Sequence, residues 1–142
     1  MKTMLAAVLT AIVGGLVTPA LAHHAIGGEY DPTKNVVLSG VVTKVDWVNP
    51  HARVYFDVTT PDGKVTNWSV ELAARVVLER MGWNGRSLRP GQKVTVRGDQ
   101  ARSGAPMLNA RAQEQRALRD GGGKPAVYPI MLEDGTPVLN DR

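Results

Sequence analysis

The sequence predicts a small all-β domain that contains one short helix. Several runs rich in β-branched residues alternate apolar and polar side chains at the period of two that is typical of strands. Turn signals built from Gly, Pro, Asn and Asp separate these runs. The apolar period changes to helical spacing at one place, between the third run and the fourth.

The first predicted strand is long and bent. It covers residues 36–48, and its alternation slips around Gly40, as is expected where a strand bends sharply or bulges. Asn49-Pro50 ends it with a turn.

The next two runs predict a hairpin. Residues 52–59 alternate cleanly and stop at Pro61-Asp62-Gly63, and residues 67–72 continue the alternation on the returning strand. The inward positions of these strands include the aromatic residues that we expect in the core, Trp47, Phe56 and Trp68.

A short helix follows, and two strands come after it. Apolar residues at helical spacing form one stripe: Ala73, Ala74, Val77, Leu78 and Met81. Gly82 closes this helix, and Arg89-Pro90-Gly91 makes the next turn. Val94 and Val96 open the fourth strand, and Leu108, Ala110 and Ala112 mark the fifth. This order resembles a five-stranded OB-like Greek-key barrel, with a small β-sandwich as the alternative.

The first residues predict export. Lys2 precedes an apolar run over residues 4–17, which is shorter than the roughly 20 residues of a membrane span. Ala20-Leu21-Ala22 then has the small-x-small pattern that a signal peptidase reads. We therefore expect a periplasmic protein, cleaved after Ala22 and without a membrane span after processing. The expected segments are a signal peptide over 1–22, an arm over 23–35, the barrel over 36–116 and a flexible tail over 117–142. A turn signal at residues 133–135 allows a weak hairpin within this tail as an alternative to disorder.

Composition removes several classes of function. The chain has no Cys, so neither disulfides nor thiol chemistry is available. Without Lys2 it keeps 16 basic and 13 acidic residues, and these are scattered. Only Tyr55 and Trp83 are expected to offer a stacking surface, so a nucleic-acid groove is not predicted. The common hydrolase and nucleotide-binding motifs are absent.

Several short motifs resemble a family of short exported bacterial proteins of uncharacterised function. The similarity covers about residues 22–115, and its most specific element is Trp47-Val48-Asn49-Pro50-His51. Members of that family often carry Asp at the position of Gln92. The motifs that carry the resemblance are His23-His24, Gly40-Val41-Val42, Trp68-Ser69-Val70-Glu71, Gly82-Trp83, Leu88 to Gln92 and Arg102-Ser103-Gly104. The resemblance implies export and a compact β domain, and it implies no activity.

The three histidines suggest a metal site. Cleavage after Ala22 would place the α-amine and the imidazole of His23 side by side as a chelating pair, which suits Cu(II). A third nitrogen could come from His24 or from His51, which we expect in the loop between the first two strands. The arrangement would resemble the histidine brace of copper proteins. The simpler reading is a mobile terminus and a His51 that hydrogen-bonds a turn.

The sequence therefore favours a non-enzymatic binding or accessory protein whose partner is a metal ion or a periplasmic protein, with copper as the candidate cofactor. No catalytic residue is assigned. One alternative is an enzyme, either a copper-dependent redox enzyme or a carbohydrate-active protein that uses Asp57 with Glu71. For Glu71 a strand face with cross-strand partners such as Arg53 and Arg97 is the simpler expectation. The other alternative is an OB-like interaction domain that binds a peptide, lipid or glycan through Tyr55, Asn67 and Arg97.

Overall fold

The computed structural model describes residues 28–111 and 129–138. The elements in these ranges are, in order, β1 (Tyr30–Asp46), β2 (Arg53–Thr59), β3 (Val65–Glu71), α2 (Arg75–Arg80), β4 (Lys93–Ala101), β5 (Met107–Asn109) and β6 (Ile130–Leu132). The predicted order of three strands, a helix and two strands is confirmed, and β6 is added to it.

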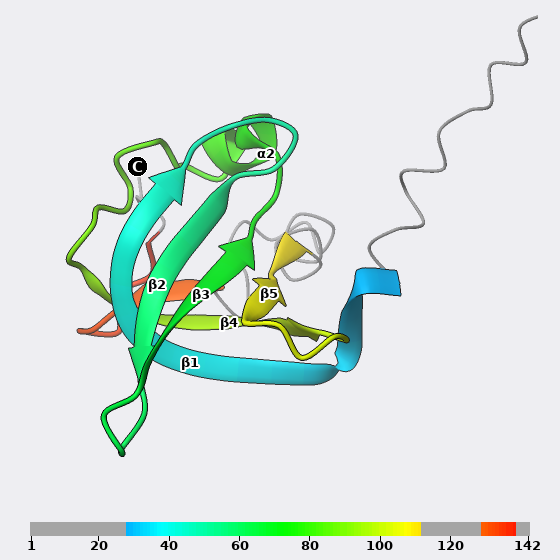
Figure 1. The fold of residues 1–142 in the computed structure, drawn as a ribbon. Coiled ribbons are helices and arrows are strands. Elements are labelled where there is room, and N and C mark those ends of the chain that lie inside the picture. Colours follow the sequence, from blue (N-terminus) through cyan, green and yellow to red (C-terminus); the bar gives the residue numbers. More distant parts are fainter. Residues whose placement is uncertain (1–27, 112–128, 139–142) are drawn as a thin grey trace, which may run out of the picture.

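The first five strands close into a barrel. Their order around the sheet is β1-β2-β3-β5-β4, and β1 pairs with β4 to complete the circle. The pairing of β3 with β5 is parallel, and the other pairings are antiparallel. Figure 1 shows β1 curving around the barrel while β2 and β3 cross its front. A closed five-stranded barrel with a helix between β3 and β4 is the OB-like architecture that the sequence predicts, and it excludes the sandwich.

β1 bends so that it can pair with two neighbours. Its first part, up to Val41, faces β4, and its last part, from Val41 onward, faces β2. Gly40 lies at the change of partner, where an added Cβ atom would be 2.4 Å from the backbone oxygen of Asp57. The absence of a side chain at Gly40 therefore allows the two strands to approach each other, as the slip in alternation indicates.

β1 begins at Tyr30, six residues before the predicted start. Residues 31–34 lack apolar alternation, and in this stretch the register to β4 is irregular, between Tyr30 and Asn35. The strand nevertheless continues through this irregular stretch, and Tyr30 is opposite Ala101 at the far end of β4. The end of the predicted N-terminal arm is thus part of the barrel.

The inward side chains form one core. Phe56 is fully buried, and Trp47 and Trp68 pack against the buried cluster, as their positions predict. The helix places Leu78 in this core and ends where Gly82 adopts a φ of 87°, a left-handed conformation that suits glycine. Trp83 then turns inward and is 4% exposed, so the expectation that it offers a surface for stacking is wrong.

Part of the predicted flexible tail is folded. Residues 129–138 form a hairpin in which β6 pairs with β4 and the amide of Leu132 donates to the carbonyl of Thr136. Ile130 is fully buried and Val138 is 4% exposed. These two side chains complete the core, which is the physical reason that this part of the chain does not behave as a tail.

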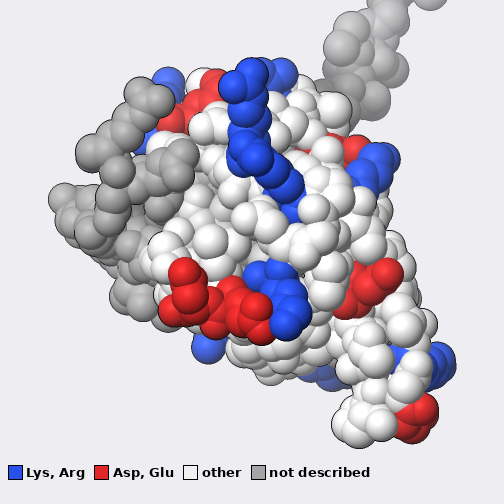
Figure 2. All heavy atoms as spheres, turned by 90° about the vertical axis from the view of Figure 1, so that its left-hand side faces the viewer, with Lys and Arg blue, Asp and Glu red and all other residues white. Residues whose placement is uncertain are grey.

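Among the residues that the structure describes, no helix has the length and apolar character needed to cross a bilayer. On the face drawn in Figure 2, acidic and basic groups alternate with wide uncharged areas. Basic side chains form one run at the top of this face, and lower down basic and acidic side chains lie next to each other.

Candidate binding site around Glu71

The outer face of the β2–β3 hairpin carries a row of polar side chains. The register places Arg53 opposite Glu71, Tyr55 opposite Ser69, and Asp57 opposite Asn67. Because successive side chains of a strand alternate between its two sides, these residues share one face while Val54 and Phe56 point into the core. In OB-folds, this face and the adjacent 1–2 and 4–5 loops are the usual ligand-binding surface.

Glu71 is the centre of a charged cluster at one end of this face. Arg53 Nη2 donates to Glu71 Oε2 at 2.8 Å, and Arg111 Nη1 donates to Glu71 Oε1 at 3.2 Å. His51 Nδ1 lies 3.3 Å from the same Oε1 atom. The side chains of Glu71 and Arg111 are each only 13% exposed, so this is a partly buried ion network. We call Tyr30, His51, Arg53, Glu71, Asn109 and Arg111 the Glu71 cluster.

Two members of the Glu71 cluster, Tyr30 and Asn109, are buried. Tyr30 is 4% exposed, and burial together with the negative charge of Glu71 raises the pKa of its phenol to about 12. Asn109 is 3% exposed, and its Oδ1 atom accepts a hydrogen bond from the backbone amide of Arg111 at 2.9 Å. Two polar side chains are therefore withdrawn from water beside an ion pair, as in a built site rather than an open strand face.

The imidazole of His51 is held in its neutral form. Burial lowers its pKa most, and the positive charge of Arg111 lowers it further. The carboxylate of Glu71 acts in the opposite direction but does not reverse the shift. Because Nδ1 faces that carboxylate, a hydrogen on Nδ1 would leave the lone pair on Nε2.

The structure places one of the three predicted metal ligands. His51 lies in the loop between β1 and β2, as expected, after a cis peptide bond between Asn49 and Pro50. His23 and His24 lie outside the described residues. Within the described ranges, no three His, Cys, Asp or Glu side chains gather closely enough to hold a metal ion. His51 alone is therefore no metal centre.

Asp57 and Glu71 do not form a pair of catalytic carboxylates. Asp57 is opposite Asn67, four residues along β3 from Glu71, a separation of roughly 13 Å. Glycosidases hold their two carboxyl groups about 5–9.5 Å apart. Asp57 instead accepts a hydrogen bond from Asn67 Nδ2 at 2.8 Å. Of the cross-strand partners expected for Glu71, Arg53 is confirmed.

Tyr55 and Asn67 share a surface, and Arg97 does not join them. The amine of Lys44 lies 5.3 Å from the centre of the Tyr55 ring, and Asn67 Nδ2 also donates to Thr43 Oγ1 at 3.1 Å. Arg97 is opposite Val37 on β4, and in the sheet order β5 separates β4 from β3. The residues predicted as one ligand-binding set are thus divided between two parts of the barrel.

The chain belongs to the family of unknown function DUF6152, whose model matches residues 11–108. The resemblance seen in the sequence is thereby confirmed at the level of the family. The matched range includes Tyr30, His51, Arg53 and Glu71, and it ends directly before Asn109.

A similarity to a solved structure is weak. Part of the chain is similar to a protein in the crystal structure of yeast Stn1 and Ten1, with 10% sequence identity and a TM-score of 0.34 over 53% of this chain. The chain spans 38% of the length of that protein. A search of the curated proteins finds no match.

Sequence reasoning missed three members of the Glu71 cluster as site residues. Asn109 is the last residue of the three-residue strand β5, and Arg111 lies two residues after it. Tyr30 was expected in the N-terminal arm. The alternation of strand β5 does place Asn109 on the side opposite Leu108, but only the parallel pairing Glu71↔Asn109 brings it to the cluster.

Proposed function

We propose that this chain is an exported, non-enzymatic binding or accessory protein that binds Cu(II) or another late transition metal. The proposed ligands are His51 and the N-terminal residues His23 and His24. The observation that carries this proposal is the position of His51, with Nδ1 3.3 Å from a carboxylate oxygen of Glu71. Export and cleavage after Ala22 are part of the proposal, because they create the α-amine.

The contact between His51 and Glu71 has the form of a supported metal ligand. A metal-bound histidine commonly donates its second ring N–H to a carboxylate, which fixes the tautomer and the orientation of the ring. A neutral imidazole is also the form that binds metal, and the lowered pKa of His51 favours that form at neutral pH. With Nδ1 facing Glu71, Nε2 of His51 would be the nitrogen that binds the metal.

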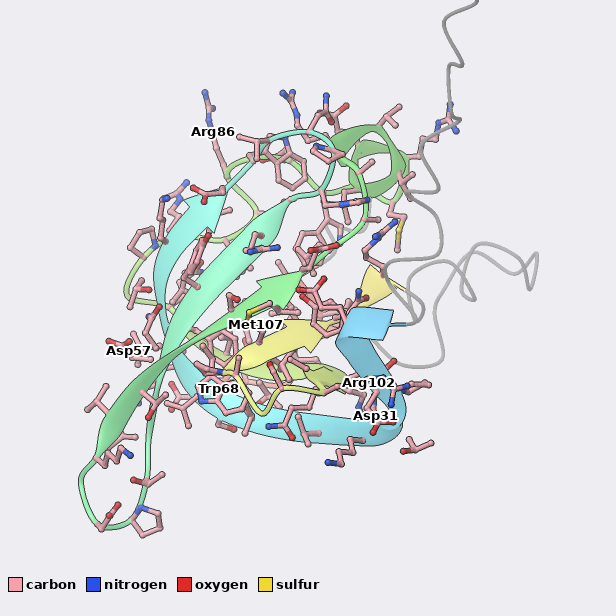
Figure 3. The ribbon with its side chains drawn as sticks, turned by 45° about the vertical axis from the view of Figure 1, so that its right-hand side comes forward. Asp31, Asp57, Trp68, Arg86, Arg102 and Met107 are labelled. Atoms are coloured by element: carbon pink, nitrogen blue, oxygen red, sulfur yellow. The ribbon has the colours of Figure 1, made fainter. Side chains whose placement is uncertain are left out.

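The N-terminal arm enters the barrel beside this cluster. Tyr30 is close enough to Glu71, Arg53 and Arg111 for their charges to act on its pKa. Figure 3 shows Asp31 next to Arg102, with which it forms an ion pair of 3.6 Å at the same end of β1. His23 is seven residues before Tyr30, and an extended chain of that length spans roughly 23–25 Å. The arm is therefore long enough to bring His23 to His51.

The charges around His51 do not favour a bound cation, so the proposed metal site needs the N-terminal nitrogens as ligands. Arg53 and Arg111 supply two positive charges, and Glu71 supplies one negative charge. The local field therefore does not attract a cation. Metal affinity must come from coordination by the amine and imidazole nitrogens, which bind late transition metals strongly.

Copper titration of the exported, processed protein tests this proposal. We expect an electron paramagnetic resonance spectrum with several nitrogen ligands in the wild type. We expect at least tenfold weaker binding both in His51→Gln and in a variant with one extra residue before His23. Glu79→Gln, an exposed carboxylate on α2, is the matched control and should bind as the wild type does. Equal spectra and affinities in all four proteins would contradict the proposal.

The same preparation separates a carrier from a redox enzyme. A copper-dependent oxidase would consume oxygen repeatedly when a reductant is supplied to the copper-loaded protein. A carrier would be reduced once and would then stop. We expect the second result, because the proposal is for a carrier.

A second candidate function is recognition of a peptide, lipid or glycan on the β2–β3 face. It is favoured by Tyr55, a half-buried aromatic ring with Lys44 above it, next to the polar pair Asn67 and Asp57. Rings of this kind stack on sugars and other flat ligands. A glycan array probed with wild type and Tyr55→Ala tests this function, with Arg97→Ala as a comparison on β4. Binding that Tyr55→Ala abolishes and Arg97→Ala retains would assign the ligand to this face.

A further inference from the structure

We propose that the Glu71 cluster also contains an oxyanion site, in which Arg53, Arg111 and Asn109 bind a carboxylate or phosphate group. This inference is independent of the proposed metal. The metal would use Nε2 of His51 and the N-terminal arm, whereas the anion would use donors that lie within the described barrel.

The first argument is the charge of the cluster. Two guanidinium groups share the single carboxylate of Glu71, through bonds of 2.8 Å and 3.2 Å. The cluster therefore keeps one uncompensated positive charge in a partly buried place, and a bound anion would neutralise it.

The second argument is an excess of donors. Both oxygens of Glu71 are occupied by the arginines, and Asn109 Oδ1 is occupied by the amide of Arg111. Arg111 Nε and Asn109 Nδ2 are buried and have no hydrogen-bond partner. Buried donors without an acceptor are costly and uncommon in folded proteins, so two of them on neighbouring side chains indicate a missing acceptor.

The third argument concerns the kind of acceptor. A carboxylate or phosphate only accepts hydrogen bonds through its charged oxygens, and it offers several of them in a geometry that suits the forked guanidinium group. A water molecule could accept from both donors but would leave the charge uncompensated. A cation cannot accept hydrogen bonds from these donors. The donor set therefore selects an oxyanion.

The cluster is open to solvent on one side. The side chains of Arg53 and His51 are 35% and 28% exposed, whereas Asn109 is 3% exposed. An anion would enter beside Arg53, the long side chain that can most easily move, and reach the buried donors behind it.

Nuclear magnetic resonance of the exported protein in a buffer with EDTA tests the proposal directly. Phosphate and malonate are titrated separately at constant ionic strength, with chloride as the balancing ion. We expect saturable shifts of the Asn109 side-chain amide and of the Arg111 Nε–H. Saturation by phosphate alone, by malonate alone or by both would support the site and would identify which oxyanion it accepts.

Two variants and one control complete the test. Arg111→Lys keeps the charge but loses Nε and the forked geometry, so we expect at least tenfold weaker binding. Asn109→Asp has nearly the same shape, replaces the unpartnered donor with an acceptor and cancels the charge, so binding should be lost. Arg86→Gln removes a positive charge from an exposed side chain that projects away from the barrel, and it should bind as the wild type does (Figure 3).

Affinity is compared only between proteins whose amide spectra match that of the folded wild type. Because Asn109→Asp is close to isosteric, it decides the question even if Arg111→Lys does not fold. The proposal is overturned if neither anion gives saturable shifts. It is also overturned if Asn109→Asp binds as tightly as the wild type, or if Arg86→Gln loses as much affinity as Arg111→Lys. Since no metal is present, these results do not depend on the outcome of the copper titration.

Discussion

Arg111 binds Glu71 across 40 positions of the sequence, with its Nη1 atom donating to Oε1 at 3.2 Å. The backbone strengthens the same connection, because the amide of Ala110 donates to the carbonyl of Glu71 at 2.9 Å. Glu71 ends β3 and Arg111 follows β5, so this contact joins the ends of the parallel strand pair of the barrel. Glu71 therefore belongs both to the candidate site and to the pairing of β3 with β5.

Replacing Glu71 by Gln should destabilise the protein. The variant keeps the shape but leaves Arg53 and Arg111 without their counter-charge in a partly buried place. Breaking a buried pair in this way costs about 3–5 kcal/mol, and the 35% exposure of Arg53 reduces the expected loss to about 2–3 kcal/mol. Urea unfolding measures the change. Glu79→Gln is the control, since its pair with Arg75 is exposed and should contribute less than about 0.5 kcal/mol.

Tyr30 should make the fold sensitive to alkali. Its pKa is raised to about 12 in the folded protein by burial and by Glu71, against the ordinary value of 10.0 in the unfolded chain. Below pH 10 the phenol is protonated in both states and the stability is intact. Between pH 10 and pH 12 only the unfolded chain loses the proton, so stability of up to about 3 kcal/mol should disappear.

Unfolding at several alkaline pH values, together with phenolate absorbance, measures this effect. Tyr30→Phe has no phenol to titrate and should lose much less stability in this range. Tyr55→Phe is the matched control and should follow the wild type. A wild type and a Tyr30→Phe variant with the same alkaline profile would show that Tyr30 does not carry the effect.

The parts of the fold that the sequence predicted depend on local pattern. The alternation in the β2–β3 hairpin, the turn at residues 61–63 and the helical stripe that contains Leu78 each follow from neighbours in the chain. Phe56 could be assigned to the core because its position in that alternation fixes the side of the strand. For the same reason Arg53 could be named as a partner of Glu71.

The parts that the sequence did not predict depend on pairing between distant segments. Asn109 and Arg111 reach Glu71 only because β5 pairs in parallel with β3. The pattern of apolar and polar residues within a strand does not indicate which distant strand will pair with it in parallel. β6 has three residues and follows a Gly-rich stretch, so its pairing with β4 leaves almost no periodic signal. The burial of Trp83 likewise depends on how the chain turns after α2, where the period has already ended.

The histidine at the site should make the fold sensitive to acid when no metal is bound. Burial and the charge of Arg111 lower the pKa of His51 below its ordinary value of 6.5, so the unfolded chain takes up the proton first. The contribution of neutral His51 is present above pH 6.5 and is lost as the pH falls through the folded-state pKa.

His51→Gln should therefore lose less stability than the wild type between neutral pH and about pH 5. Urea unfolding in the presence of EDTA measures this difference. Both proteins contain the same carboxylates, so the difference between their stabilities isolates the contribution of His51. A wild type that loses no more stability than His51→Gln over this range would contradict the assignment.

Gly40 should not tolerate a side chain. A Cβ atom at this position would lie 2.4 Å from the backbone oxygen of Asp57 and 2.9 Å from Cδ2 of Phe56. The first of these neighbours is backbone, so β1 and β2 would have to separate, and we expect Gly40→Ala to cost about 3 kcal/mol. Gly28→Ala is the control, because a Cβ there meets nothing within 4 Å and should change the stability by less than about 0.5 kcal/mol. Thermal unfolding of the two variants should separate them clearly.

The C-terminal hairpin should contribute to the stability of the whole barrel. Ile130 is fully buried and pairs opposite Val96, a buried residue of β4. Truncation of a buried Ile to Ala removes packing and leaves a cavity, at a cost of about 2–5 kcal/mol. We therefore expect Ile130→Ala to lower the midpoint of urea unfolding. The unfolding should remain a single transition, which the fluorescence of Trp68 and Trp83 follows. Lys93→Met, which breaks only the exposed ion pair with Glu133, should have little effect. If Ile130→Ala unfolded at the wild-type midpoint, residues 129–138 would not contribute to stability, and the five strands of the barrel would be stable without them.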